Sequence, residues 1–200
     1  STTEFGATDT VGVTNGGTGV STLTDNGVLI GNGTSAVDVT AAGATGEVLS
    51  GVTGGNPTFQ RWCQAAVKTS DESVTSSTSY QDDDHLKFYV AANEVWSFNI
   101  VLRGTANVSG GLKIRFTVPS GATCRGLAQI SGFWTHTNVD WTAGVGTTTA
   151  LATTNLGGIS GYVENSSTAG WVQLQFAQNA SFGTSTTLMK GTILQAVRVS

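Results

Sequence analysis

Alternation of apolar and polar residues dominates the chain after residue 62. The stretch LKIRFTV (112–118) places aliphatic or aromatic residues at every second position, and WVQLQFAQ (171–178) does the same. This period is typical of a β-strand with one face in a core. Further strands are predicted at 85–90, 94–102, 126–134, 158–164 and 192–199. Short strands separated by turn-rich segments favour a β-sandwich or jelly roll for residues 62–200.

A different pattern occupies residues 15–59, where small residues surround regularly placed aliphatics. Writing GVLIGNGTSAVDV (27–39) above EVLSGVTGGNPTF (47–59) aligns the two stretches at an offset of 20 residues. Each stretch predicts a short strand, a Gly/Asn turn and a returning strand. A flexible Gly/Ser linker is the alternative. The repeated VL-x-G register favours β-hairpin repeats over that linker.

One such hairpin has too little apolar surface to be stable alone in water. Several copies around an axis would bury a shared core, and with two units in one chain the neighbours are best supplied by other chains. We therefore predict a trimeric stem over residues 19–61. Its core residues would be Val28, Leu29, Val37, Val39, Val48, Leu49 and Phe59. Residues 1–18, rich in Thr and Gly, predict an attachment arm ordered only by contact, anchored through Phe5, Val11 and Val13.

Composition narrows the class of protein. Charged residues make up 11% of the chain, against about 25% in an ordinary soluble domain, so neutral polar residues provide the solvation. An all-β protein is expected, with Gln, Thr and Ser faces suited to burial between subunits. The net charge of -4 and the lack of a Lys/Arg cluster exclude nucleic acid as an expected partner.

Cellular location and cysteine chemistry are constrained less directly. The start of the chain has no signal-peptide pattern and no apolar run reaches 18 residues, so we expect folding in a cytoplasm and no membrane insertion. Ser1 is small enough to follow a removed initiator Met, so a nearly complete protein is expected. Cys63 and Cys124 lack metal-site or redox spacing and are interpreted as buried thiols, with one disulfide as the alternative.

Two sets of motifs carry a resemblance. The stretch GGTGVSTLTDNGVLIGNGTSAVDVTAAGATGEVLSG resembles repeats in the fibres of tailed bacteriophages, in which GGTG, GVLxGNGTxA and TAAGxxGxVLxG recur. The stretch SDESVTSSTSYQDDDHLKFYVAANEVWSFNIVL, with KIRFTVPSGAT and LQFAQN, is similar to C-terminal modules of phage virion proteins. Those modules resemble C1q/TNF-like jelly rolls, which generally trimerise. Together the two resemblances span most of residues 15–200.

The resemblance implies a virion protein, assembled in the host cytoplasm, with an arm, a stem and a jelly-roll head. The expected partners are two further copies and other virion proteins, either the major capsid protein or tail proteins. Because only two repeats precede the head, a capsid-attached head fibre or decoration protein is the favoured interpretation. A receptor-binding tail fibre or fibre tip is the alternative. A carbohydrate-binding module is a third, for which a monomer and a signal peptide would be expected.

Two polar clusters are candidates for metal or ligand binding. Asp82, Asp84 and His85 form a weak candidate for a metal site, since alternate strand residues share a face and only the two aspartates would converge. The simpler interpretation of this acidic cluster is a solvated turn before a strand, or an intersubunit contact to Arg103, Arg115 or Arg125. Residues 133–141 predict a loop carrying Trp134, His136, Asp140 and Trp141. The favoured interpretation is that one or both tryptophans fill the jelly-roll core or the trimer axis. Stacking of a host-surface glycan on these rings is the alternative. No nucleophile motif or carboxylate pair stands out, so we expect neither an enzyme nor a cofactor.

Overall fold

The chain adopts an all-β structure in two compact units. The computed structural model describes residues 10–130, 134–147 and 157–200, and the units are Ser1–Trp62 and Cys63–Ser200. In the described ranges every regular element is a β-strand except one turn of 3-10 helix, η1 (Val13–Asn15). The all-β prediction is confirmed. The described ranges contain no helix with the length and hydropathy of a membrane span.

The first unit contains the two hairpins that the repeat predicts. Strand β1 (Leu29–Ile30) pairs with β2 (Asp38–Val39), and β3 (Val48–Val52) pairs with β4 (Gly55–Gln60), both antiparallel. Leu29 lies opposite Val39, and Leu49 lies opposite Phe59. The same pairing therefore recurs 20 residues later, and the linker alternative is wrong for these segments.

Residues 10–18 are more ordered than the predicted arm. The carbonyl of Val11 accepts a hydrogen bond from the amide of Gly19, and the carbonyl of Thr18 accepts one from Val37. Gly19 has φ +74°, and a Cβ there would lie 2.9 Å from the Cα of Ala36. The prediction of an arm ordered only by external contact is therefore wrong for this segment, because it is hydrogen-bonded to the first hairpin. Phe5 lies outside the described residues.

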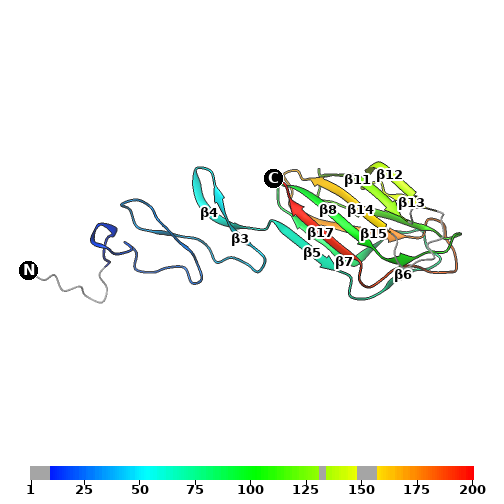
Figure 1. Ribbon diagram of the computed structural model, residues 1–200, viewed down its shortest axis with the longest axis horizontal. Helices are drawn as coiled ribbons and strands as arrows, with labels where there is room; N and C mark the ends of the chain where they lie inside the picture. The colour runs from blue at the N-terminus through cyan, green and yellow to red at the C-terminus, as the bar shows by residue number, and fades with distance from the viewer. Residues whose placement is uncertain (1–9, 131–133, 148–156) are drawn as a thin grey trace, which may run out of the picture. The chain divides into compact units, whose positions relative to one another are not determined.

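In the described residues, the second unit contains thirteen strands in three sheets. Figure 1 labels most of these strands. Their bounds are β5 (Cys63–Val67), β6 (Glu72–Val74), β7 (Gln81–Val90), β8 (Val95–Leu102), β9 (Gly104–Thr105), β10 (Leu112–Thr117), β11 (Thr123–Ile130), β12 (Trp134–Asp140), β13 (Val145–Thr147), β14 (Gly157–Glu164), β15 (Gly170–Ala177), β16 (Thr186–Leu188) and β17 (Ile193–Arg198). One sheet has the order β12-β11-β14-β8-β17-β5, a second β13-β10-β15-β7, and a small third β6-β16-β9. All pairings are antiparallel.

The six-stranded and four-stranded sheets pack face to face around an aromatic core. Phe88 of β7 lies 6.0 Å from Trp96 and 5.8 Å from Phe98 of β8, between ring centroids. Phe98 in turn lies 5.1 Å from Phe116 of β10. These rings occupy the inward positions of strands in which apolar and polar residues alternate. The period-two pattern therefore places them between the two sheets.

Strand positions follow the sequence pattern closely, with two differences. Strand β7 begins at Gln81, so the three consecutive aspartates lie within a strand rather than in a turn before it. Strand β11 ends at Ile130, and Trp134 begins the next strand instead of ending this one. The short strands β5, β6, β9, β13 and β16 were not predicted, since two to five residues carry too little periodic signal.

Candidate functional site

The segment predicted to be a ligand-binding loop is mostly strand. Trp134, His136 and Asp140 all belong to β12, whose partners on β11 are Ile130, Ala128 and Arg125 respectively. The prediction of one loop is therefore wrong, because a backbone paired along β11 cannot gather these residues as a loop would. The structure describes only the backbone of Trp134 and His136.

Asp140 and Trp141 take separate roles at the end of β12. Trp141 is fully buried, and its ring packs edge-on against Phe116 at 5.6 Å, so it belongs to the core. Asp140 is exposed, and its Oδ1 accepts hydrogen bonds from the Thr142 hydroxyl and amide. The hydroxyl bond is the largest influence lowering the pKa of Asp140, followed by the amide bond. This carboxylate stabilises the turn after the strand, and Trp141 cannot stack a surface ligand.

The acidic cluster is divided by a β-bulge. Strand β7 shifts register against β15 between the positions facing Gln173 and Gln175. Asp83 turns into the interior, while Asp84 is exposed and Asp82 accepts a hydrogen bond from the Gln175 amide at 2.6 Å. Asp82 and Asp84 are thus both exposed, as their alternation predicts, with Asp83 buried between them.

His85 likewise has a local partner. Its Nε2 lies 2.8 Å from the Thr69 hydroxyl, and its Nδ1 is buried. Across the described residues, no three metal-ligating side chains lie close enough to hold an ion. The cluster thus offers a bulge and an ion pair rather than a set of converging ligands.

Asp83 forms the centre of a buried ionic network. Its Oδ2 accepts a 2.7 Å hydrogen bond from Lys68 Nζ, and both side chains are fully buried. Lys68 also pairs with Glu72 at 2.7 Å, and Asp83 Oδ1 accepts the amides of His85 and Leu86. Burial pushes the pKa of Lys68 down, but the bonds and charges of Asp83 and Glu72 outweigh it and raise the pKa overall. The network fixes β7 at its bulge.

The two cysteines are free thiols. Cys124 is buried, and this burial raises the pKa of its thiol. Cys63 is exposed at the start of β5, so the expectation of two buried thiols is wrong for this residue. The disulfide alternative is also excluded, since the two cysteines are not bonded.

The first unit exposes the aliphatic residues assigned to the stem core. Val28, Leu29, Val48 and Leu49 are exposed by 37–58%. Val37, Val39 and Phe59 are partly buried, and the Phe59 ring lies so close to Gly43 that a Cβ there would be 2.6 Å away. Among residues 10–62, Thr40 alone is classed as buried. One chain therefore does not supply a core for this unit.

The middle of the outward face of the six-stranded sheet is almost free of charge. Its residues lie in three rows across β5, β17, β8, β14 and β11, and Val67, Ile193 and Val101 are direct neighbours in one row. The three rows contain Val67, Ile193, Val101, Gly158, Gln129; Ala65, Gln195, Asn99, Ser160, Leu127; and Cys63, Val197, Ser97, Tyr162, Arg125. Arg125 is the one charged member of these three rows. It lies at their edge opposite Asp140 of β12, and Glu164 of β14 follows in the next row, opposite Thr123 and Val95. We call this surface the neutral face.

A shallow hollow crosses the neutral face along β14. It measures about 280 Å³, and Val101 and Leu127 stand on either side of Gly158 and Ser160. The small residues of β14 create the depression because they rise less than the aliphatics beside them. Val101 and Val197 are 61% and 54% exposed, so the apolar character of this face is accessible.

Sequence reasoning missed the members of this face, although a signal was present. The stretch TILQAVRV carries apolar residues on both faces of its strand, with Leu194 and Ala196 inward and Ile193 and Val197 outward. Strands covered on both faces show this continuous apolar character. The exposed Trp171 of β15 was also missed, because its alternating neighbours were assessed only for their inward positions.

Comparison with models of protein families, with curated proteins and with solved structures finds no match to this chain.

Proposed function

We propose that this chain is a structural protein of a tailed-bacteriophage virion, a trimeric head fibre or decoration protein that projects a jelly-roll head from the capsid. The observation that carries the proposal is the first unit's lack of a core. Hairpins with one buried residue between positions 10 and 62, and with four aliphatics exposed, need apolar surface from other chains. The phage-fibre motifs occur in this same unit.

The head supports the trimer through its neutral face. Burying neutral amides and hydroxyls costs less than burying ions, and the aliphatics Val67, Ile193 and Val101 gain from leaving water. Exposed apolar patches rimmed by polar residues mark interaction sites. Two further copies of the same chain are the occupants we propose for this face.

The strand order supports the jelly roll. Leaving aside β11 and β12, successive main strands alternate between the two large sheets except at β10 and β13, which are neighbours in one sheet: β5, β8, β14 and β17 lie in the six-stranded sheet, and β7, β10, β13 and β15 in the four-stranded one. Eight strands wound across two sheets define a jelly roll. Strands β11 and β12 would then be an added hairpin that extends one sheet beyond β14.

Sedimentation velocity on the full chain at micromolar concentration tests the assembly. Three copies of the 20.5 kDa chain are expected to sediment together. A clean monomer would overturn the stem and the neutral face as subunit contacts, and would favour the carbohydrate-binding module instead.

Gold-labelled antibody on purified phage particles tests the location. Label over the capsid supports the head fibre or decoration protein, and label at the tail favours the tail-fibre alternative. Particles without label would contradict both virion positions.

A further inference from the structure

The outward face of the four-stranded sheet presents an exposed aromatic pair. Trp171 of β15 is 52% exposed and lies directly opposite Tyr89 of β7, which is 39% exposed. The rings meet edge to face with centroids 5.5 Å apart and planes at 77°. Gln64 of β5 fixes the Tyr89 backbone, because its side chain accepts from the amide and donates to the carbonyl of that residue. Gln64 thus holds the backbone of Tyr89, the residue whose ring packs against Trp171. We call this pair of rings the aromatic platform.

A single cation accompanies the platform. Lys87 lies two residues before Tyr89 on β7, and its Nζ is 5.4 Å from the centroid of the Trp171 ring. Such a contact is weak at an exposed site. A ligand that stacks on the ring can therefore displace the ammonium at low cost and still retain it as a neighbour.

The rest of this face is polar and favours an anion. Beyond the platform, the next row across the strands contains Thr117, Gln173 and Lys87. The row after it contains Arg115, Gln175 and Asp82, and Lys113 lies in a third row. Lys87, Lys113 and Arg115 are three of the chain's nine Lys and Arg residues, on a protein whose net charge is -4. Lys113 and Arg115 both lie over the Tyr80 ring, at 4.4 and 4.3 Å. The local charge is thus opposite in sign to that of the whole chain.

We propose that the aromatic platform binds an acidic glycan. The C–H face of one sugar ring would stack on Trp171, since the negative face of an aromatic ring attracts the weakly positive hydrogens of the sugar. An anionic substituent of that sugar would accept a hydrogen bond from the Lys87 ammonium. To donate this bond, the ammonium would move off the Trp171 ring. This gives the expected host-surface glycan a site other than the 134–141 segment.

A sugar fits this surface better than a protein partner. The apolar area consists of two rings surrounded by hydrogen-bonded polar side chains, whereas a stable protein interface buries about 800 Å² on each partner. Two rings match one or two sugar units. The proposal goes beyond the assembly role and needs only one head unit; trimerisation would add avidity.

Binding of the full chain to an array of printed glycans tests the proposal. The array carries uronate-, sialate- and phosphate-bearing oligosaccharides beside neutral ones of the same backbones. Wild type is expected to bind acidic glycans preferentially. Trp171→Ala is expected to reduce that binding by about tenfold or more, and Phe182→Ala, which removes an aromatic ring 36% exposed elsewhere, is expected to leave it unchanged.

Lys87→Gln separates the charge from the stacking. It is expected to lower the ratio of acidic to neutral binding by about tenfold while neutral binding persists. Binding of no glycan on the array, or full binding by Trp171→Ala, would overturn the site, and equal wild-type binding of acidic and neutral glycans would overturn the assignment of an acidic ligand. Sedimentation of the same preparations reports the trimer separately, so failure of the glycan site and failure of the assembly role give different results.

Discussion

Removal of the Asp83 carboxylate should destabilise the head unit severely. The change Asp83→Ala leaves the Lys68 ammonium fully buried with Glu72 as its remaining partner in the network, and it removes the acceptor of two backbone amides. Breaking a buried ion pair costs about 3–5 kcal/mol, and each stranded amide adds about 1 kcal/mol or more. The expected loss is about 5 kcal/mol, a large part of the stability of an ordinary domain.

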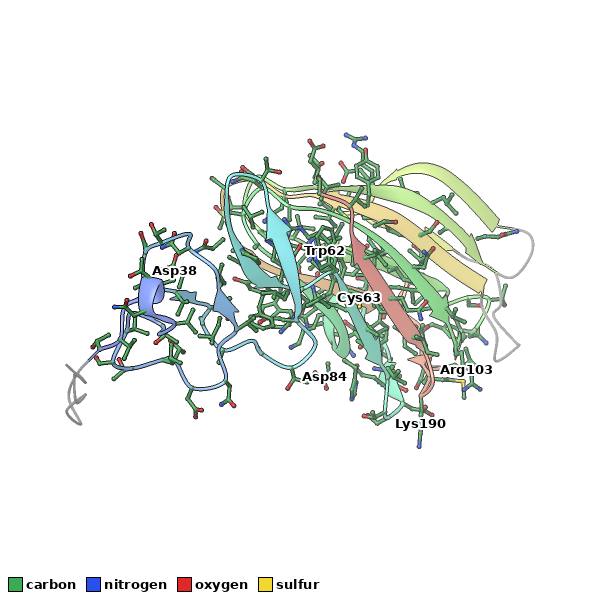
Figure 2. All side chains as sticks on the ribbon, turned by 60° about the vertical axis from the view of Figure 1, so that its left-hand side comes forward. Asp38, Trp62, Cys63, Asp84, Arg103 and Lys190 are labelled. Carbon is green, nitrogen blue, oxygen red and sulfur yellow. The ribbon has the colours of Figure 1, made fainter. Side chains whose placement is uncertain are left out.

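Urea unfolding of the full chain, followed by tryptophan fluorescence at one fixed protein concentration, measures this loss. Asp83→Asn keeps an acceptor for the amides and removes only the charge, so about 3 kcal/mol is expected. The matched control is Asp84→Asn, the exposed neighbour labelled in Figure 2, with an expected change within about 0.5 kcal/mol. Equal midpoints for Asp83→Asn and Asp84→Asn would refute the assignment of a buried, stabilising pair.

Three further results are expected. Above about pH 9 the Cys124 thiol ionises in the unfolded chain, whereas burial keeps it protonated in the folded one. The free energy of unfolding should therefore fall by about 1.4 kcal/mol for each unit of pH above that point. Urea midpoints of Cys124→Ala, measured from pH 8 to 10, should lack this fall. Gly126→Ala places a Cβ 2.0 Å from the Ser160 carbonyl and should cost about 3 kcal/mol in urea unfolding, whereas Gly183→Ala has open space and should cost little. Val101→Glu on the neutral face should reduce the sedimenting mass, and Thr117→Glu on the opposite sheet should not. Parallel pH curves for wild type and Cys124→Ala would contradict the first prediction, and equal urea midpoints for Gly126→Ala and Gly183→Ala would contradict the second. An unchanged sedimenting mass for Val101→Glu would contradict the third.

The strands could be predicted where periodicity extended over enough residues. Leu112, Ile114 and Phe116 are all buried, as their spacing indicates, and Leu49 faces Phe59 as the hairpin repeat requires. Pairing between distant strands was beyond the pattern. The row Val67, Ile193, Val101 joins three segments far apart in the chain, and the alternation within each segment does not specify its neighbours.

The candidate residues were harder to predict because a residue type does not reveal its partner. Three consecutive aspartates suggested two on one face, but the bulge turned Asp83 inward to Lys68, which lies on a different segment. Arg103 and Lys190 show the same limit at one end of the head unit in Figure 2: the Arg103 guanidinium donates to the Lys190 carbonyl at 2.9 Å, a contact between turns that no local pattern indicates. Trp141 lies in the core, as the favoured interpretation of the two tryptophans predicted.

The distribution of charge gives the two outer faces of the head different roles. The neutral face has its charges, Arg125, Asp140 and Glu164, only at its edge, whereas Lys87, Lys113, Arg115 and Asp82 lie across the opposite face. Removing those ions from water would cost several kcal/mol each unless new partners compensated, so that face should stay solvated in an assembly. A trimer closed through the neutral face therefore leaves Trp171 accessible. If subunits instead met through the charged face, Trp171→Ala would change the sedimenting mass as well as glycan binding, and the two proposals could not both hold.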